Sequence, residues 1–268
     1  MSQRVLPQSF VSNPRSASHS GKSANGSRAV TFCDDEDREL FSRNGLESFE
    51  SFWRQPQIFV DAVNYRRGGW SGVSRLELKD RNNERLFFIK RQENQFRYSW
   101  RHPMGRLTFE EEAKALRLTH RLGLPAVPLI CFGKSRETGA TRGLLVTRAI
   151  ARPSLADLIE SRPDWRTLTT LLAHCGEQLY RFHAHRIRHG ALYPNHIFLD
   201  LASRTVTLID FEGSRVCRTT DAAIAADLPQ LIRRLKGMPE EARELLLRPY
   251  FQHHEKLMQA LMRDRKTR

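Results

Sequence analysis

Two neighbouring stretches decide the fold: HGALYPNHIFLD at residues 189–200 and LIDFEG at residues 208–213. The first is a polar loop that leads into the short apolar strand IFL, and the second is an apolar strand that ends at Asp210. An aspartate that leaves a buried strand can hold Mg²⁺ through its oxygens, although it can also cap the next segment. His196 ends the polar loop, where it can face a metal-bound phosphate or serve a structural purpose. Together the two stretches predict a polar site between two short strands.

A glycine-rich stretch, RRGGWSGV, lies earlier in the chain at residues 66–73. Its glycines, Gly68, Gly69 and Gly72, fall in a turn between two predicted strands. Because glycine has no Cβ, the backbone N–H groups of such a turn can approach phosphate oxygens closely. An ordinary β-hairpin explains the same residues, and the stretch standing alone favours that explanation.

A lysine and a glutamate follow at a spacing that allows them to pair. Lys90 ends the apolar strand LFFIK, where its ammonium can meet nucleotide phosphates. Glu112 lies on a predicted helix over residues 108–122, and its carboxylate can fix the ammonium of Lys90. Its neighbour Glu111 points about 100° away around the helix, so only one of the two faces inward. Thr108, three residues before Glu111, is expected to form a capping box.

The order of these features is more informative than any one of them: glycine turn, strand lysine, helix glutamate, polar loop, strand aspartate. The same parts in the same order serve kinase-type phosphoryl transfer. We therefore predict an α+β fold of two lobes, a β-rich N-lobe with one helix and a mainly helical C-lobe. The expected boundaries are a disordered tail over residues 1–33, the N-lobe with an N-terminal helix over 34–148, and the C-lobe over 149–268.

Hydrophobic periodicity supplies the individual elements. Ser154 and Thr167 are expected to cap the two helices that open the C-lobe. The polar tail cannot bury enough apolar surface to offset its ordering entropy. Strands are predicted at residues 56–65, 70–80, 85–92, 123–133 and 142–150, and helices at 34–56, 108–122, 154–161, 167–187, 227–237 and 239–264.

The composition indicates anionic partners. The formal net charge is +14, which suits nucleotides, phosphorylated sugars, nucleic acid or an acidic membrane surface. No zinc pattern, recognition helix or RNP-type strand supports nucleic acid. No apolar run approaches the ~18 residues of a membrane span, and no secretory signal is visible. The four cysteines have no close pairing, so we expect free thiols and a cytoplasmic protein, with peripheral contact at the inner membrane left open.

On these motifs the chain resembles the lipopolysaccharide kinase family of the protein-kinase-like superfamily, namely the WaaP-type core heptose kinases and their InaA-type relatives. The resemblance covers roughly residues 58 to 250, and its glycine loop is degenerate. It implies ATP and Mg²⁺ as cofactors. Lys90 matches the nucleotide-binding lysine and Glu112 its helix partner. The loop matches the catalytic loop, with His189 and His196, and Asp210 matches the metal-binding aspartate.

Several positions depart from ordinary kinases. Ala191 stands where the catalytic-base aspartate is expected, and the WaaP-type pattern retains that aspartate. His196 replaces the metal-binding asparagine, but the WaaP-type loop also has histidine there. Gly190 replaces an arginine that reads activation-loop phosphorylation, and Glu212 replaces the usual glycine after Asp210. A further match, held loosely, is Asp227 with the helix aspartate that supports the catalytic loop.

Three hypotheses follow. The first is a kinase that moves the γ-phosphate of ATP to a sugar hydroxyl of the lipopolysaccharide core, with Asp210 and His196 holding the metal. The second is a pseudokinase that binds nucleotide as a regulator or scaffold, because a missing general base costs about 10²–10⁴ in rate. The third and weakest is a basic nucleic-acid binder that uses the same fold. The acceptor hydroxyl and the oligomeric state are not predicted by the sequence.

Overall fold

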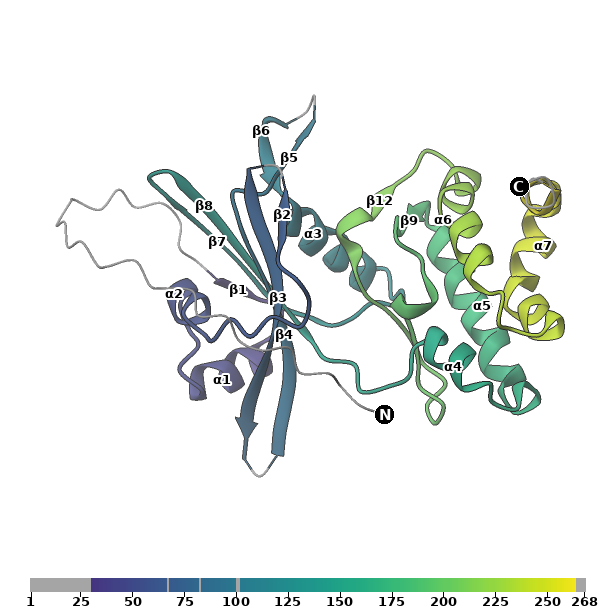
Figure 1. Cartoon of the computed structure of the whole chain (residues 1–268), viewed down its shortest axis with the longest axis horizontal. Coiled ribbons are helices and arrows are strands. Elements are labelled where there is room, and N and C mark those ends of the chain that lie inside the picture. The colour runs from purple at the N-terminus through teal and green to yellow at the C-terminus, as the bar shows by residue number, and fades with distance from the viewer. Residues whose placement is uncertain (1–29, 67, 82, 100–101, 264–268) are drawn as a thin grey trace.

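The structure has two lobes joined by a single chain segment (Figure 1). The computed structural model describes residues 30–66, 68–81, 83–99 and 102–263, so most of the predicted tail lies outside it. In the first lobe an antiparallel sheet separates two short N-terminal helices from one longer helix, and the second lobe is mainly helical. The helices are α1 (Asp35–Arg43), α2 (Phe49–Trp53), α3 (Thr108–Arg121), α4 (Leu155–Ser161), α5 (Thr169–Ala184), α6 (Thr220–Arg234) and α7 (Glu240–Arg263).

The main sheet has six strands in the order β1-β7-β8-β4-β3-β2, all antiparallel. Three two-stranded sheets accompany it, β5 with β6 in the first lobe and β9 with β12 and β10 with β11 in the second. The strands are β1 (Val30–Phe32), β2 (Asn64–Arg66), β3 (Gly69–Asp80), β4 (Asn83–Glu93), β5 (Phe96–Ser99), β6 (His102–Leu107), β7 (Leu129–Glu137), β8 (Ala140–Arg148), β9 (Ile187–Arg188), β10 (Ile197–Leu199), β11 (Val206–Leu208) and β12 (Arg215–Val216).

Strand β4 determines what each face of the main sheet carries. Ile89 is fully buried in the aromatic core beneath α1 and α2, so the alternation of a strand turns Lys90 to the opposite face, toward α3. Arg91 points back into the core, where its guanidinium donates to Ser74 Oγ at 2.5 Å and to the Phe52 carbonyl at 2.9 Å. Burial lowers the pKa of Arg91 to about 10. Consecutive residues of one strand therefore carry charges to opposite sides of the sheet.

Two predictions for the N-terminal region are wrong in detail. Residues 30–32 do not belong to the predicted tail of residues 1–33, because they form the edge strand β1, which pairs with β7. The single helix predicted over residues 34–56 is divided into α1 and α2, because Gly45 adopts φ +73° and reverses the chain. Each helix then has its own cap, Asp34 for α1 and Ser48 for α2.

Helix α3 begins where it was predicted, but its N-terminal cap is a side chain of strand β4. Thr108 is the first helical residue and forms no capping box with Glu111. Instead, Gln92 on β4 accepts hydrogen bonds at its Oε1 from the Phe109 N–H, at 2.7 Å, and from the Thr108 hydroxyl, at 3.1 Å. The start of α3 is thereby fixed to the strand that carries Lys90.

The hairpin of β5 and β6 was not predicted. Its sequence mixes Arg, Tyr, Trp, His and Pro without the regular alternation that marks a half-buried strand. The hairpin connects β4 to α3, and Arg97 on β5 donates to the Glu212 carbonyl of the second lobe at 3.4 Å. The hairpin therefore contacts the segment that follows Asp210 in the second lobe.

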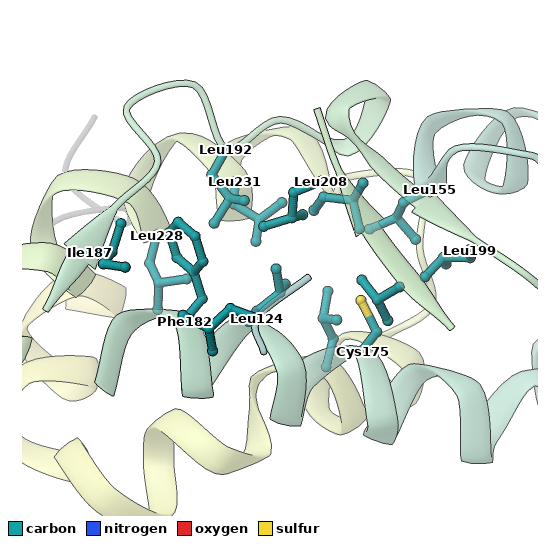
Figure 2. Close-up of a cluster of buried hydrophobic side chains, with 14 of the residues drawn as sticks. Leu124, Leu155, Cys175, Phe182, Ile187, Leu192, Leu199, Leu208, Leu228 and Leu231 are labelled. Atoms are coloured by element: carbon teal, nitrogen blue, oxygen red, sulfur yellow. The ribbon is translucent and has the colours of Figure 1, made fainter. Parts of the chain in front are cut away.

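The core of the second lobe gathers side chains from nearly every element of that lobe. Figure 2 shows Leu155 of α4, Phe182 of α5, Ile187 of β9, Leu208 of β11 and Leu228 of α6 converging, and all are buried. This core supports the short strands on either side of the polar loop from below.

The predicted starts of the C-lobe helices are partly correct. Ser154 caps α4 as predicted, in a capping box with Asp157. Thr167 caps nothing, because it lies inside a 3₁₀ turn, Trp165–Leu168, that Asp164 caps and that leads into α5. Helix α6 begins at Thr220, before the predicted residue 227, and α7 is kinked at His254.

The prediction of free thiols is confirmed for Cys33, Cys131, Cys175 and Cys217. Burial raises the pKa of Cys175 to about 12, so that thiol stays protonated near neutral pH. Within the described part of the chain, no helix combines the length and the apolar character that a membrane span requires.

Candidate active site

The lysine and the glutamate predicted to pair do so. Lys90 Nζ donates to Glu112 Oε1 at 2.7 Å, and the Glu112 side chain is only 1% exposed. Burial by itself would lower the pKa of Lys90, but the charges of Glu112 and Asp210 outweigh it and raise that pKa. The ammonium is therefore charged at neutral pH. Glu111 points outward, where it accepts from Arg106 at 3.0 Å, and this settles which glutamate faces inward.

Asp210 lies between the lysine and the polar loop. Its Oδ1 is 3.9 Å from Lys90 Nζ and its Oδ2 is 3.8 Å from His196 Nδ1. The residue adopts the left-handed region, at φ 65° and ψ 67°, which is uncommon for a residue other than glycine and marks a constrained position. The side chain is 37% exposed, so the carboxylate is accessible to a ligand. The structure thus brings Lys90, Glu112, Asp210 and His196 into one site, as predicted.

The polar loop fixes the orientation of His196. The imidazole Nδ1 hydrogen-bonds to the Ala191 carbonyl at 2.8 Å. A carbonyl only accepts, so Nδ1 carries the proton, and a neutral ring keeps its lone pair on Nε2. The nitrogen closest to Asp210 is therefore committed to the loop, and only Nε2 is available to bind a metal or to accept from a ligand.

The donor set fits a metal held jointly with a ligand. Among the described residues, no three His, Cys, Asp or Glu side chains are grouped closely enough to hold an ion by themselves. Mg²⁺ commonly binds through one or two carboxylates, with substrate phosphates and water completing its shell. Asp210 offers such a carboxylate beside the charged Lys90, so the residues present fit Mg²⁺ bound together with a nucleotide.

A buried carboxylate holds the polar loop from below. Asp227 on α6 accepts from the N–H groups of His189, at 2.5 Å, and Gly190, at 2.8 Å, as the match to a supporting aspartate implied. It also hydrogen-bonds to His183 Nε2 at 3.1 Å, and His183 Nδ1 bonds to the Tyr250 hydroxyl at 2.7 Å. Burial would raise the pKa of Asp227, but the bonds from His183 and the loop lower it below its usual value. The network connects the loop to α5, α6 and α7.

Gly190 brings the loop into close contact with the segment that follows Asp210. Its φ is +84°, and a Cβ there would lie 2.6 Å from the Gly213 carbonyl oxygen. No side chain fits in that space, which explains why the arginine of many kinase loops is missing. The sequence showed the two glycines but not their contact.

His189 was predicted among the catalytic residues, but it is fully buried and cannot touch a substrate. Its ring packs edge-on against Phe211, with centroids 4.9 Å apart, and its Nδ1 accepts from the Ala191 N–H at 3.3 Å. Burial lowers the pKa of His189 to about 4, so the ring is neutral at physiological pH. His189 is a positioning residue for the loop.

The depressed pKa of His189 predicts a loss of stability on acidification. The unfolded chain takes up a proton near pH 6.5, whereas the folded protein does so only near pH 4. The free energy of unfolding should therefore fall by about 3 kcal/mol between these pH values. Urea denaturation of wild type and His189→Gln at several pH values measures this loss. A wild-type curve that is flat over this range, or a loss that persists unchanged in the variant, would contradict the prediction.

The three glycines of the predicted phosphate loop have different environments. Gly68 lies in the turn after β2 with φ +76° and open space around it. A Cβ on Gly69 would lie 2.1 Å from the Glu93 carbonyl oxygen, and one on Gly72 would lie 2.4 Å from the Phe59 ring. Gly69 and Gly72 therefore have packing reasons to be glycine. A phosphate-binding role for this turn stays a prediction.

Comparisons with known proteins agree with this geometry. A family model described as "Lipopolysaccharide kinase (Kdo/WaaP) family" matches residues 50–252. The protein InaA of Escherichia coli (strain K12) is 30% identical over 202 residues, which cover 72% of this chain and 91% of that protein.

One solved structure shows the fold. It is described as WaaP in complex with acyl carrier protein, and it aligns with 89% of this chain and 98% of its own at a TM-score of 0.53 and 16% identity. At that identity the likeness shows the fold alone, and it confirms the predicted two-lobe architecture.

Proposed function

Because the chain belongs to the lipopolysaccharide kinase (Kdo/WaaP) family, we propose that it binds ATP with Mg²⁺ between its lobes and transfers a phosphoryl group to a sugar hydroxyl of the lipopolysaccharide core. One observation supports this most directly. Lys90 is held by the buried Glu112 at 2.7 Å and lies 3.9 Å from Asp210, so a fixed cation and an accessible carboxylate share one site.

Each residue has a distinct part in this proposal. Lys90 neutralises nucleotide phosphates, and Glu112 keeps its ammonium in place. Asp210 holds the metal, and His196 accepts or coordinates through Nε2. Bound Mg²⁺–ATP supplies the phosphoryl group and shields its charge. The net charge of +14 suits an anionic glycolipid acceptor and attachment to the inner face of a membrane with acidic lipids.

Position 191 supports a second candidate, a pseudokinase. Ala191 offers no proton acceptor to the attacking hydroxyl, and the full burial of His189 removes the nearest alternative in the loop. Phosphoryl transfer depends largely on positioning and on charge stabilisation, so a chain without the base can still turn over slowly. A nucleotide-binding regulator uses the same Lys90, Glu112 and Asp210 but produces no transfer.

A transfer assay with labelled ATP and purified core oligosaccharide distinguishes the two candidates. For an active kinase we expect incorporation by the wild type and its loss in Lys90→Ala and Asp210→Ala. Lys79→Ala and Asp35→Ala, which alter exposed residues of the first lobe, are matched controls that should keep full incorporation. Thermal stabilisation by Mg²⁺–ATP without any transfer would identify the pseudokinase. Full incorporation by Lys90→Ala and Asp210→Ala would show that these roles are wrong.

A further inference from the structure

The second lobe carries four arginines on and beside the small sheet of β9 and β12. Arg188 and Arg215 lie directly opposite each other in this antiparallel pair. Arg186 and Arg218 flank them, and the Cys217 N–H donates to the Arg186 carbonyl at 2.7 Å. Hereafter these four residues are called the arginine cluster. In Figure 1 both strands lie between α6 and α3, on the side of the helical lobe that is turned toward the first lobe.

The arginine cluster faces away from the core. Ile187, between Arg186 and Arg188, is one of the buried side chains that Figure 2 shows inside the lobe. Side chains alternate along a strand, so Arg188 and the opposite Arg215 share the outer face. Arg186, Arg215 and Arg218 are exposed and Arg188 is half-buried.

The positive charges of the cluster are not paired with carboxylates among the described residues. Like charges directly opposite each other in an antiparallel pair are destabilising. Within the described residues, none of the four arginines forms an ion pair with a carboxylate, and the Nε of Arg188 is buried without a hydrogen-bond partner. Asp221, the next acid after Arg218, is engaged by His254 Nδ1 at 2.6 Å. The positive charge of the cluster is therefore available to an anion from outside the protein.

The cluster borders the candidate active site on two sides. Arg188 precedes Ala191 by three residues, a span of at most about 11 Å even in a fully extended chain. Arg215 follows the Asp210 segment, and the Ser214 hydroxyl donates to the Arg188 carbonyl at 3.0 Å. Only residues 214–219 separate the 3₁₀ turn at Phe211–Gly213 from α6, so no long activation segment intervenes in the sequence.

We infer that the arginine cluster binds a phosphate group already present on the acceptor, next to the hydroxyl that is to be phosphorylated. Arginine is suited to this because its planar guanidinium binds phosphate oxygens in pairs and stays charged. Gly190 leaves the loop without the arginine that would bind a phosphate on the chain itself, whereas Arg186, Arg215 and Arg218 are exposed to an external ligand. That the ligand is the acceptor rests on the proposed function, but the preference for phosphate does not.

Binding of core oligosaccharide tests the inference without any need for turnover. The oligosaccharide is used with its phosphates intact and after chemical dephosphorylation. We expect the intact form to bind wild type about tenfold to a hundredfold more tightly. Arg215→Gln/Arg218→Gln, a double variant of exposed residues, should lose this preference and bind both forms equally. Arg136→Gln/Arg166→Gln removes the same charge from exposed positions elsewhere and should keep it.

The remaining outcomes are decisive as well. Equal binding of the two forms by wild type, or an equal loss in both double variants, would overturn the inference. Vesicles of phosphatidylglycerol and of phosphatidylcholine form a further arm: if only vesicle binding fell in Arg215→Gln/Arg218→Gln, the phosphate would belong to a lipid headgroup and the acceptor assignment would be wrong. Binding of a non-hydrolysable ATP analogue is measured alongside. If the analogue did not bind but the preference for phosphate remained, the proposed function would be rejected. The inference that the arginine cluster binds phosphate would still hold.

Discussion

Replacing Ala191 with aspartate should raise the rate of phosphoryl transfer to the core sugar by about 10²–10⁴-fold. A carboxylate at this position can take the proton of the attacking hydroxyl, which the alanine methyl group cannot. The substitution fits the backbone, since position 191 is half-buried and its N–H and carbonyl are already fixed by His189 and His196. Only the side chain changes, and the loop geometry is retained.

Single-turnover measurements with saturating Mg²⁺–ATP isolate this effect. Ala191→Asn is the matched control, because it has nearly the same shape but cannot accept a proton at neutral pH. A gain in Ala191→Asp alone would show that the general base is the missing part. If Ala191→Asp and wild type transferred at the same rate, Ala191 would not be what limits this chain.

Removing the Asp227 carboxylate should destabilise the protein by at least about 3 kcal/mol. In Asp227→Ala the His189 N–H and the His183 Nε2 lose their acceptor in the core, and the Gly190 N–H loses a partly buried hydrogen bond, at about 1–3 kcal/mol each. Tyr250→Phe removes only the hydroxyl that bonds to His183 and should cost about 1 kcal/mol. Urea denaturation at neutral pH measures both variants.

The same carboxylate gives a second measurement in acid. The folded pKa of Asp227 is depressed, so its contribution is complete above about pH 4 and is lost as the pH falls further. This range lies below the pH 6.5 to 4 interval assigned to His189. In Asp227→Ala the free energy of unfolding should fall less steeply below pH 4 than in wild type. The loss between pH 6.5 and 4 that is assigned to His189 should remain. An Asp227→Ala protein as stable as Tyr250→Phe would show that the network does not support the loop.

The sequence predicted the parts of the site better than their surroundings. Lys90, Glu112 and Asp210 could be found because each is a charged residue at the end of an apolar segment or on a helix start, and their order limits the fold. The choice between Glu111 and Glu112 could not be made, because a rotation of 100° around a helix does not say which side meets the sheet. The contact with β4 decides it.

The features that were missed depend on contacts between distant residues. The cap of α3 comes from Gln92, sixteen or seventeen positions away from the groups that it binds. β1 contains only three residues, and its pairing with β7 cannot be inferred from VTF alone. The burial of His189 depends on Phe211 and on the helices beneath the loop. The local sequence pattern does not show this burial, so His189 was placed among the catalytic residues.

The consecutive charges of β4 have a consequence for folding fidelity. A slip of one residue in the pairing of β4 would exchange the two faces of the strand. Lys90 would then turn toward the aromatic core under α1 and α2, away from Glu112, and Arg91 would turn to the opposite face, away from the Phe52 carbonyl and the Ser74 hydroxyl that accept from its guanidinium. Each misplaced cation would lose its partners, so both losses raise the free energy of the shifted register. The strand that carries the lysine of the site therefore also disfavours a wrong register in the sheet.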